Sequence, residues 1–129
     1  MKLFCETIFS DTLPAIRAIV TSEMTTRYGM NQMEIAEKLE ITQPAVSQYK
    51  NGIRGKRFRQ LLSDPKLMEW VRNLTDDIVN DRVKLYEKVC EICATTRAHN
   101  IYSKKELDPF LCLIQMWDQR TKKDVKASV

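Results

Sequence analysis

The sequence is poor in the residues that interrupt helices, since its 129 residues include three glycines and four prolines. That scarcity argues against a β-sandwich with many turns and favours helices. A chain of this length is also too short for a barrel enzyme or a two-domain dinucleotide enzyme. Apolar residues make up 43% and charged residues 29%, which suits a chain that buries a core. We therefore expect one compact domain, or a small domain with an appendage.

Long hydrophobic runs are lacking as well. No run approaches the roughly 18 apolar residues that a membrane-spanning helix needs. The first residues lack the long apolar stretch of a signal peptide, and an acid already follows at Glu6. We expect a cytoplasmic protein without a membrane partner. Its four cysteines are then thiols or metal ligands rather than structural disulfides.

The net charge is modest at +4, so the placement of the basic residues is more informative than their excess. One stretch of ten residues contains five basic side chains and no acid, namely Lys50, Arg54, Lys56, Arg57 and Arg59. Taken alone, such a run is compatible with a solvated surface loop or with a contact to nucleic acid. The residues that precede it decide between these interpretations.

Apolar residues recur along the chain at intervals of three and four, and no strand pattern is visible, so the predicted fold class is all-α. We expect a leader with Cys5 over residues 1–10, a helix-turn-helix domain over 11–60, and a helical dimerisation and metal- or cluster-binding region over 61–129. Within these, the spacing and cap residues predict helices over about 12–28, 32–39, 43–51, 65–96 and 105–120, the fourth of which could kink or split at Asn80-Asp81.

Residues 32–51 have the spacing of a helix-turn-helix, in which two short helices cross closely through a tight turn. The contact residue on the first helix must be small, and Ala36 meets this need. Asn31, with Glu34 three residues later, is suited to cap the first helix and Thr42 the second, while Glu40 occupies a turn position that glycine often fills. The shared apolar core is predicted to consist of Ile35, Leu39, Ile41, Val46 and Tyr49.

The outward face of the second helix carries side chains that suit base reading. Glutamine pairs with adenine through two hydrogen bonds, and serine both donates and accepts. The basic run begins where this helix ends, so it can lie along the phosphates. The predicted DNA-binding residues are Gln32, Thr42, Gln43, Pro44, Ser47, Gln48, Lys50, Asn51, Arg54, Lys56 and Arg57.

Three segments, residues 13–19 (LPAIRAI), 28–36 (YGMNQMEIA) and 42–49 (TQPAVSQY), carry a family resemblance. They resemble archaeal transcriptional regulators of the xenobiotic-response-element, or lambda-repressor-like, helix-turn-helix class. The resemblance covers about residues 5–57 and implies a DNA-binding transcriptional regulator. Some members of that group are fused to a thiamine-phosphate synthase domain, which this chain lacks.

Cys90 and Cys93 form a CxxC pair on a predicted helix, where positions three apart share a face. With Cys5 and Cys112 they match the ligand number of a tetrahedral zinc or of an iron–sulfur cluster. The residues themselves leave other interpretations open. Cys5 and Cys112 suit buried thiols, Cys90 and Cys93 suit a redox pair, and His99 suits an ordinary surface histidine.

The family resemblance extends to the cysteines, because short regulators of this group are similar in having an N-terminal Cys-Glu, here Cys5-Glu6, and a CxxC followed by a further cysteine. It implies a 4Fe–4S cluster held by Cys5, Cys90, Cys93 and Cys112, with zinc as the alternative. Such a cluster would clamp the DNA-binding half to the dimerisation half and make DNA binding sensitive to redox state.

The interpretation that follows is a non-enzymatic, homodimeric regulator that binds a palindromic operator in double-stranded DNA. The apolar stripe from Leu67 to Ile92, with the final helix, is expected to form the dimer interface, and the alternative for the stripe is a core within one chain. A dimer would present two recognition helices about 34 Å apart. The alternatives are a thiol redox protein that uses Cys90 and Cys93, and an antitoxin-like module whose main partner is another protein.

Overall fold

The computed structural model describes residues 4–52, 55–99 and 101–102, and every regular element within these ranges is a helix. The predicted all-α class is therefore confirmed for this part of the chain. The helix predicted over 105–120, Cys112 and Arg54 lie outside the described residues. No helix within the described ranges is both long and apolar enough to cross a membrane.

The chain is already helical where its description begins. Helix α1 (Phe4–Thr7) and a π-helical turn, η1 (Ile8–Thr12), continue without a break into α2 (Leu13–Tyr28). Where the sequence led us to expect a leader, residues 4–10 thus extend the helix. Pro14 explains the wide turn, because its ring would clash with the carbonyl four residues earlier in a regular α-helix. The N–H of Leu13 instead bonds to the carbonyl of Ile8, five residues back.

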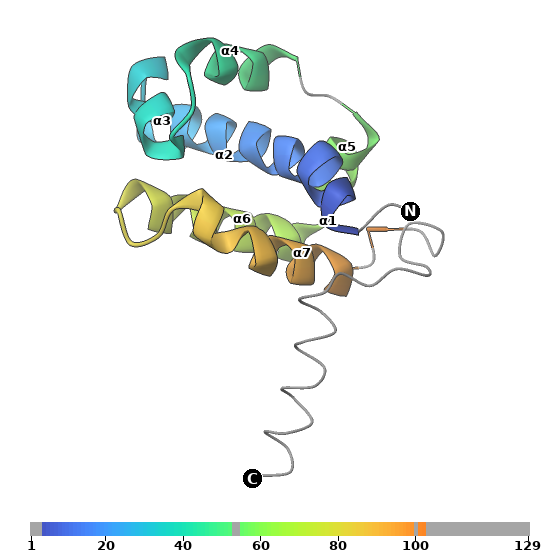
Figure 1. Ribbon diagram of the computed structural model, residues 1–129. Helices are drawn as coiled ribbons and strands as arrows, with labels where there is room; N and C mark the ends of the chain where they lie inside the picture. Colours follow the sequence, from blue (N-terminus) through green and yellow to red (C-terminus); the bar gives the residue numbers. More distant parts are fainter. Residues whose placement is uncertain (1–3, 53–54, 100, 103–129) are drawn as a thin grey trace, which may run out of the picture.

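Helix α2 lies in the middle of the fold (Figure 1). Helices α3 (Gln32–Leu39) and α4 (Gln43–Asn51) lie on one side of it, and α6 (Pro65–Val79) and α7 (Val89–Ala98) lie on the other. It ends, as predicted, at Gly29, which adopts the left-handed conformation at φ +61°. Half of the residues of α2 are buried, and they pack against helices on both sides. They are Leu13, Ala15, Ile16, Ala18, Ile19, Val20, Thr21 and Met24.

Helix α5 (Lys56–Leu62) was not predicted from the sequence, which indicated a linker up to Gly55 and no further helix before Pro65. The helix is fixed by two buried side chains one turn apart, because Leu61 is fully buried and Arg57 is 7% exposed. Only the first of these is apolar, so hydrophobic spacing gives little sign of the helix.

The long helical stretch predicted over 65–96 is split at Asn80-Asp81, where the sequence suggested a kink or a break. Helix α6 ends there, and a 3-10 turn, η2 (Leu85–Lys88), leads into α7. Asp81 adopts a left-handed conformation at φ +58°. The chain then turns back, and the far end of α7 reaches the start of α6, where His99 Nδ1 lies 2.8 Å from Asp64 Oδ2.

The apolar stripe expected to contribute to a dimer interface is buried within one chain, which was the alternative for these residues, and the final helix of that prediction lies outside the described residues. Because the chain turns back after α6, the stripe packs into the same hydrophobic core as Ile16 of α2 and Val46 of α4. Val89 is half-buried. The other stripe residues are 0–4% exposed and are Leu67, Val71, Leu74, Ile78, Leu85 and Ile92.

Candidate nucleic-acid interface

Side-chain caps define where both helices of the α3–α4 pair begin. Asn31 Oδ1 accepts the backbone N–H of Glu34 at 2.8 Å, and Glu34 Oε1 accepts the N–H of Asn31 at 3.4 Å. Thr42 Oγ1 accepts the N–H of Ala45 at 3.2 Å. Both predicted caps are thus confirmed. They satisfy N–H groups that the first turn of a helix leaves without a partner.

The turn between the two helices has the conformation that the sequence required of Glu40. This residue lies at φ 56° and ψ 43°, in the left-handed region. Its side chain is paired, because Glu40 Oε1 accepts a hydrogen bond from Lys84 Nζ at 2.6 Å. That bond raises the pKa of the Lys84 ammonium. The acid in the turn is therefore compensated by a cation from the loop after α6.

The inner face of the pair is apolar and closely packed. Ala36 is 8% exposed, and its carbonyl accepts the N–H of Ile41 at 3.0 Å, which closes the turn. Ile41 and Tyr49 are half-buried. The remaining predicted core residues of the pair are 0–6% exposed and are Ile35, Leu39 and Val46.

The opposite face of α4 is polar and exposed. The side-chain amides of Gln43 and Gln48 make no hydrogen bond to any residue that the structure describes. Ser47, between them, is half-buried, and Gln32 at the start of α3 is half-buried as well. The other exposed residues of this predicted set are Thr42, Pro44 and Asn51. The structure therefore leaves the side-chain amides of Gln43 and Gln48 available to an outside partner.

The predicted cations do not share one environment. Lys56 is exposed at the first position of α5, and Lys50 is half-buried near the end of α4. Arg57 is turned inward, where the sequence led us to expect a phosphate contact. Its Nε and Nη2 atoms donate to Asp11 Oδ2 at 3.1 and 3.0 Å, and its Nη1 atom donates to the Ile101 carbonyl at 2.6 Å. Arg57 is thus left out of the interface proposed below.

Tyr102 completes the cluster around Arg57, whose guanidinium carbon lies 4.4 Å from the centre of the tyrosine ring. The tyrosine hydroxyl shares hydrogen bonds with Thr12 Oγ1 at 2.6 Å and Thr96 Oγ1 at 3.1 Å. Burial raises the pKa of Tyr102. This cluster joins the N-terminal helix, α5 and α7, and its members are too distant in sequence for a local pattern to reveal it.

The two described cysteine side chains lie in different environments, although the spacing predicted a shared face. Cys90 is exposed on α7, whereas Cys93 is 6% exposed and packs into the core. A step of three residues turns a helix by about 300°, which is enough to move one of them off the solvent face. Across the described residues, no three His, Cys, Asp or Glu side chains are placed to hold a metal. Cys112 and the side chain of Cys5 lie outside what the structure describes, so the predicted set of four cysteine ligands stays a prediction.

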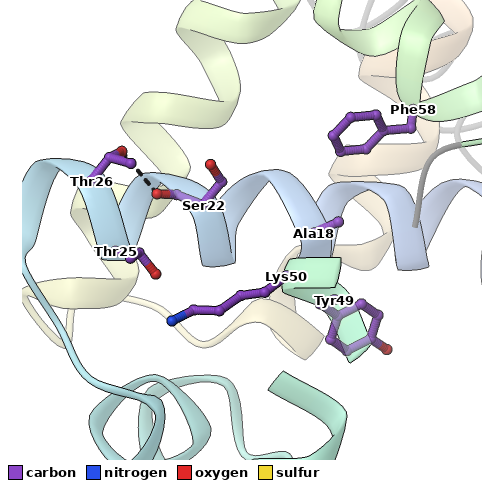
Figure 2. Close-up of a pocket in the computed structure, with 7 residues that line it drawn as sticks. All are labelled: Ala18, Ser22, Thr25, Thr26, Tyr49, Lys50 and Phe58. Carbon is purple, nitrogen blue, oxygen red and sulfur yellow. Dashed lines mark hydrogen bonds between the residues drawn. The ribbon is translucent and has the colours of Figure 1, made fainter. Parts of the chain in front are cut away.

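A groove beside α4 was missed from the sequence (Figure 2). It lies between α2, the end of α4 and α5, and it has a volume of about 220 Å³. Its lining residues are Ala18, Ser22, Thr25, Thr26, Tyr49, Lys50 and Phe58. Three separate helices contribute to this set, and no spacing within one helix could have revealed it.

Comparison with known proteins does not assign the chain to a family. No protein-family model, no curated protein and no solved structure matches the sequence. The resemblance to archaeal helix-turn-helix regulators therefore stays a prediction from motifs.

Proposed function

We propose that this chain binds double-stranded DNA through α3 and α4, with α4 in the major groove. The observation that carries the proposal is the division of α4 into two faces. Val46 is fully buried against the core, while Gln43 and Gln48 are exposed and make no hydrogen bonds within the described part of the chain. A major groove admits one α-helix, and glutamine amides match the paired donor and acceptor of adenine.

Contacts to the DNA backbone would position α4 without reading sequence. Lys56 and Asn51 are exposed on either side of the link from α4 to α5, which places them to approach phosphates at one end of the recognition helix. The caps at Asn31 and Thr42 add rigidity, because they fix where α3 and α4 begin.

We propose that the chain acts as a homodimeric transcriptional regulator on a palindromic operator. Since the stripe of α6 and α7 is buried within the chain, a dimer would use another surface. Two copies would need their α4 helices about 34 Å apart to read successive major grooves.

The test is a binding assay on a duplex enriched from a random pool by the protein itself. Gln43→Ala and Gln48→Ala should each cost about 1–3 kcal/mol on the enriched duplex and much less on random DNA. Lys56→Ala should weaken binding to both duplexes alike. It should also reduce the slope of log binding constant against log salt concentration by about one unit. Failure to bind any duplex at low salt would refute the proposal, and equal losses on both duplexes for all three variants would refute the assignment of roles.

The iron–sulfur cofactor stays a prediction from the family resemblance and is tested separately. Anaerobic purification followed by iron and sulfide analysis should find both elements if Cys5, Cys90, Cys93 and Cys112 hold a cluster. Stoichiometric zinc would favour the alternative metal, and neither metal would refute both.

A further inference from the structure

The groove beside α4 brings an aromatic ring, hydroxyl groups and a cation around one small space (Figure 2). Ala18, Ser22 and Thr25 lie along α2, while Phe58 lies at one end. The ammonium end of Lys50 points away from the Phe58 ring and toward Thr25. The side chain thus follows α2 instead of extending outward from α4.

Lys50 has no counter-ion among the residues that the structure describes. Its side chain is half-buried, it forms no ion pair with the described residues, and none of the groove's lining residues is acidic. Tyr49, another lining residue, accepts a hydrogen bond at its hydroxyl from Arg17 Nη1 at 3.3 Å. Partial removal of an ammonium from water without a partner costs free energy. An anion in the groove would offset that cost.

The hydroxyl groups define the other polar contacts. Thr25 donates to the carbonyl of Thr21 at 2.9 Å, and Thr26 donates to the carbonyl of Ser22 at 2.8 Å. The protons of these two threonines are therefore engaged, and their oxygens can only accept from a ligand, whereas the hydroxyls of Ser22 and Tyr49 donate to no described residue and can donate to an anionic group. A matching ligand would carry a donor, such as a hydroxyl or an amino group, as well as its negative charge.

The size of the groove restricts the ligand further. Its volume of about 220 Å³ is smaller than that of most drug-binding sites, which begin at roughly 300 Å³. Phe58 offers a ring against which one flat ring can stack. We propose that the groove formed by α2, α4 and α5 binds a small anion built on a single aromatic ring that carries a hydroxyl or amino group, with Lys50 as its cationic partner.

This proposal goes beyond DNA binding and does not depend on it, since it concerns the chain without DNA. The two sites are nevertheless connected, because Tyr49 and Lys50 belong to the helix that the proposed function places in the major groove. If α4 adopts alternative positions, a ligand in the groove would favour the position to which it binds more tightly.

The experiment is a titration of the full-length ¹⁵N-labelled protein with 4-hydroxybenzoate, followed by amide chemical shifts. We expect saturable shifts at Ala18, Ser22, Thr25 and Lys50. The neutral analogue 4-hydroxybenzamide should give much weaker shifts, because it lacks the charge. Lys50→Gln should weaken 4-hydroxybenzoate binding about tenfold, as expected for loss of a charge-assisted contact.

The matched control is Lys66→Gln, which removes an exposed cation from α6, away from the groove. This variant should bind 4-hydroxybenzoate as the parent does, and Phe58→Leu should bind it more weakly while keeping the dispersed spectrum of a folded protein. The proposal is overturned if no saturable shifts appear or if Lys50→Gln and Lys66→Gln behave alike. It is also overturned if duplex DNA shifts the groove amides while 4-hydroxybenzoate does not, since Lys50 would then serve a DNA phosphate.

Discussion

Adjacent basic residues at the start of α5 lie in different environments. Lys56 is exposed, whereas Arg57 is 7% exposed and bonds to Asp11 and Ile101. Each step along a helix turns the side chain by about 100°, so a run of basic residues in sequence does not give one basic face. Arg57 lies one turn before the buried Leu61 and therefore shares its inward face.

Arg57→Ala should lower the free energy of unfolding by about 2–4 kcal/mol, because it removes an ion pair and leaves the Ile101 carbonyl without its donor. Lys56→Ala is the matched control and should change stability by no more than about 0.5 kcal/mol. Urea unfolding followed by circular dichroism measures both. Equal stabilities of the two variants would show that the cluster around Arg57 contributes little.

Thr42 stabilises α4 through one hydrogen bond, from the N–H of Ala45 at 3.2 Å. Thr42→Ala should therefore cost about 1 kcal/mol of stability, the usual cost of losing an N-cap. Thr42→Ser keeps the capping oxygen and should retain most of the stability in the same urea titration. A Ser variant as unstable as the Ala variant would assign the loss to the threonine methyl group and not to the cap.

Among the elements, those with side-chain caps were predictable and those fixed by distant partners were not. The caps at Asn31 and Thr42 and the terminal Gly29 act within a few residues, so the sequence indicates where α2 ends and where α3 and α4 begin. Helix α5 begins at Lys56, and the residue before it, Gly55, has no side chain that could cap the helix. Its inward face depends on Arg57, whose bonds to Asp11 and Ile101 reach residues more than forty positions away along the chain.

The same distinction applies to the candidate site. The outward polar face of α4 follows from helical geometry, because Gln48, two residues after the buried Val46, lies about 200° away around the helix, while Gln43 is exposed at its first position. The groove beside α4 required the packing of three helices, and the inward turn of Arg57 required Asp11 and Tyr102. Neither follows from the local pattern that predicts a recognition helix.

Helix α7 should shield Cys93, but not Cys90, from alkylation. Cys90 is exposed and Cys93 is 6% exposed, so iodoacetamide under native conditions should modify Cys90 at least about ten times faster. Peptide mass spectrometry gives the rate at each position, and the rates should converge in strong denaturant. Similar native rates would mean that α7 opens readily or that its register differs.

At the scale of the molecule, α2 separates two helical layers, and long-range polar contacts connect them at their edges. Lys84 bonds to Glu40 at 2.6 Å and Lys38 to Asp81 at 2.8 Å, which joins the turn of the helix-turn-helix to the loop after α6. Both carboxylates belong to residues in the left-handed conformation. Each turn is therefore held by its backbone and by an ion pair to the other layer, which orients α4 relative to α6 and α7.

A third contact closes the α6–α7 layer at Asp64 and makes stability depend on pH. Asp64 Oδ1 accepts the N–H of Leu67 at 3.1 Å, and Oδ2 lies 2.8 Å from His99 Nδ1. These bonds, the one from Leu67 foremost, lower the pKa of Asp64 below its ordinary 3.8. For a carboxyl whose pKa is lowered by folding, the stabilisation is complete above the ordinary value and is lost as the pH falls through the lowered value.

Asp64→Asn tests this linkage, because asparagine keeps an oxygen for the N–H of Leu67 but carries no charge. The parent should be more stable than the variant at pH 5, and the difference should shrink as the pH falls toward about 2, measured as the free energy of unfolding in urea. Glu69→Gln is the matched control: Glu69 is exposed on the same helix and forms no ion pair with the described residues. Its difference from the parent should stay nearly constant. A constant difference for Asp64→Asn as well would mean that the contact with His99 does not depend on the charge of Asp64, and that α6 and α7 are held together at this end by packing alone.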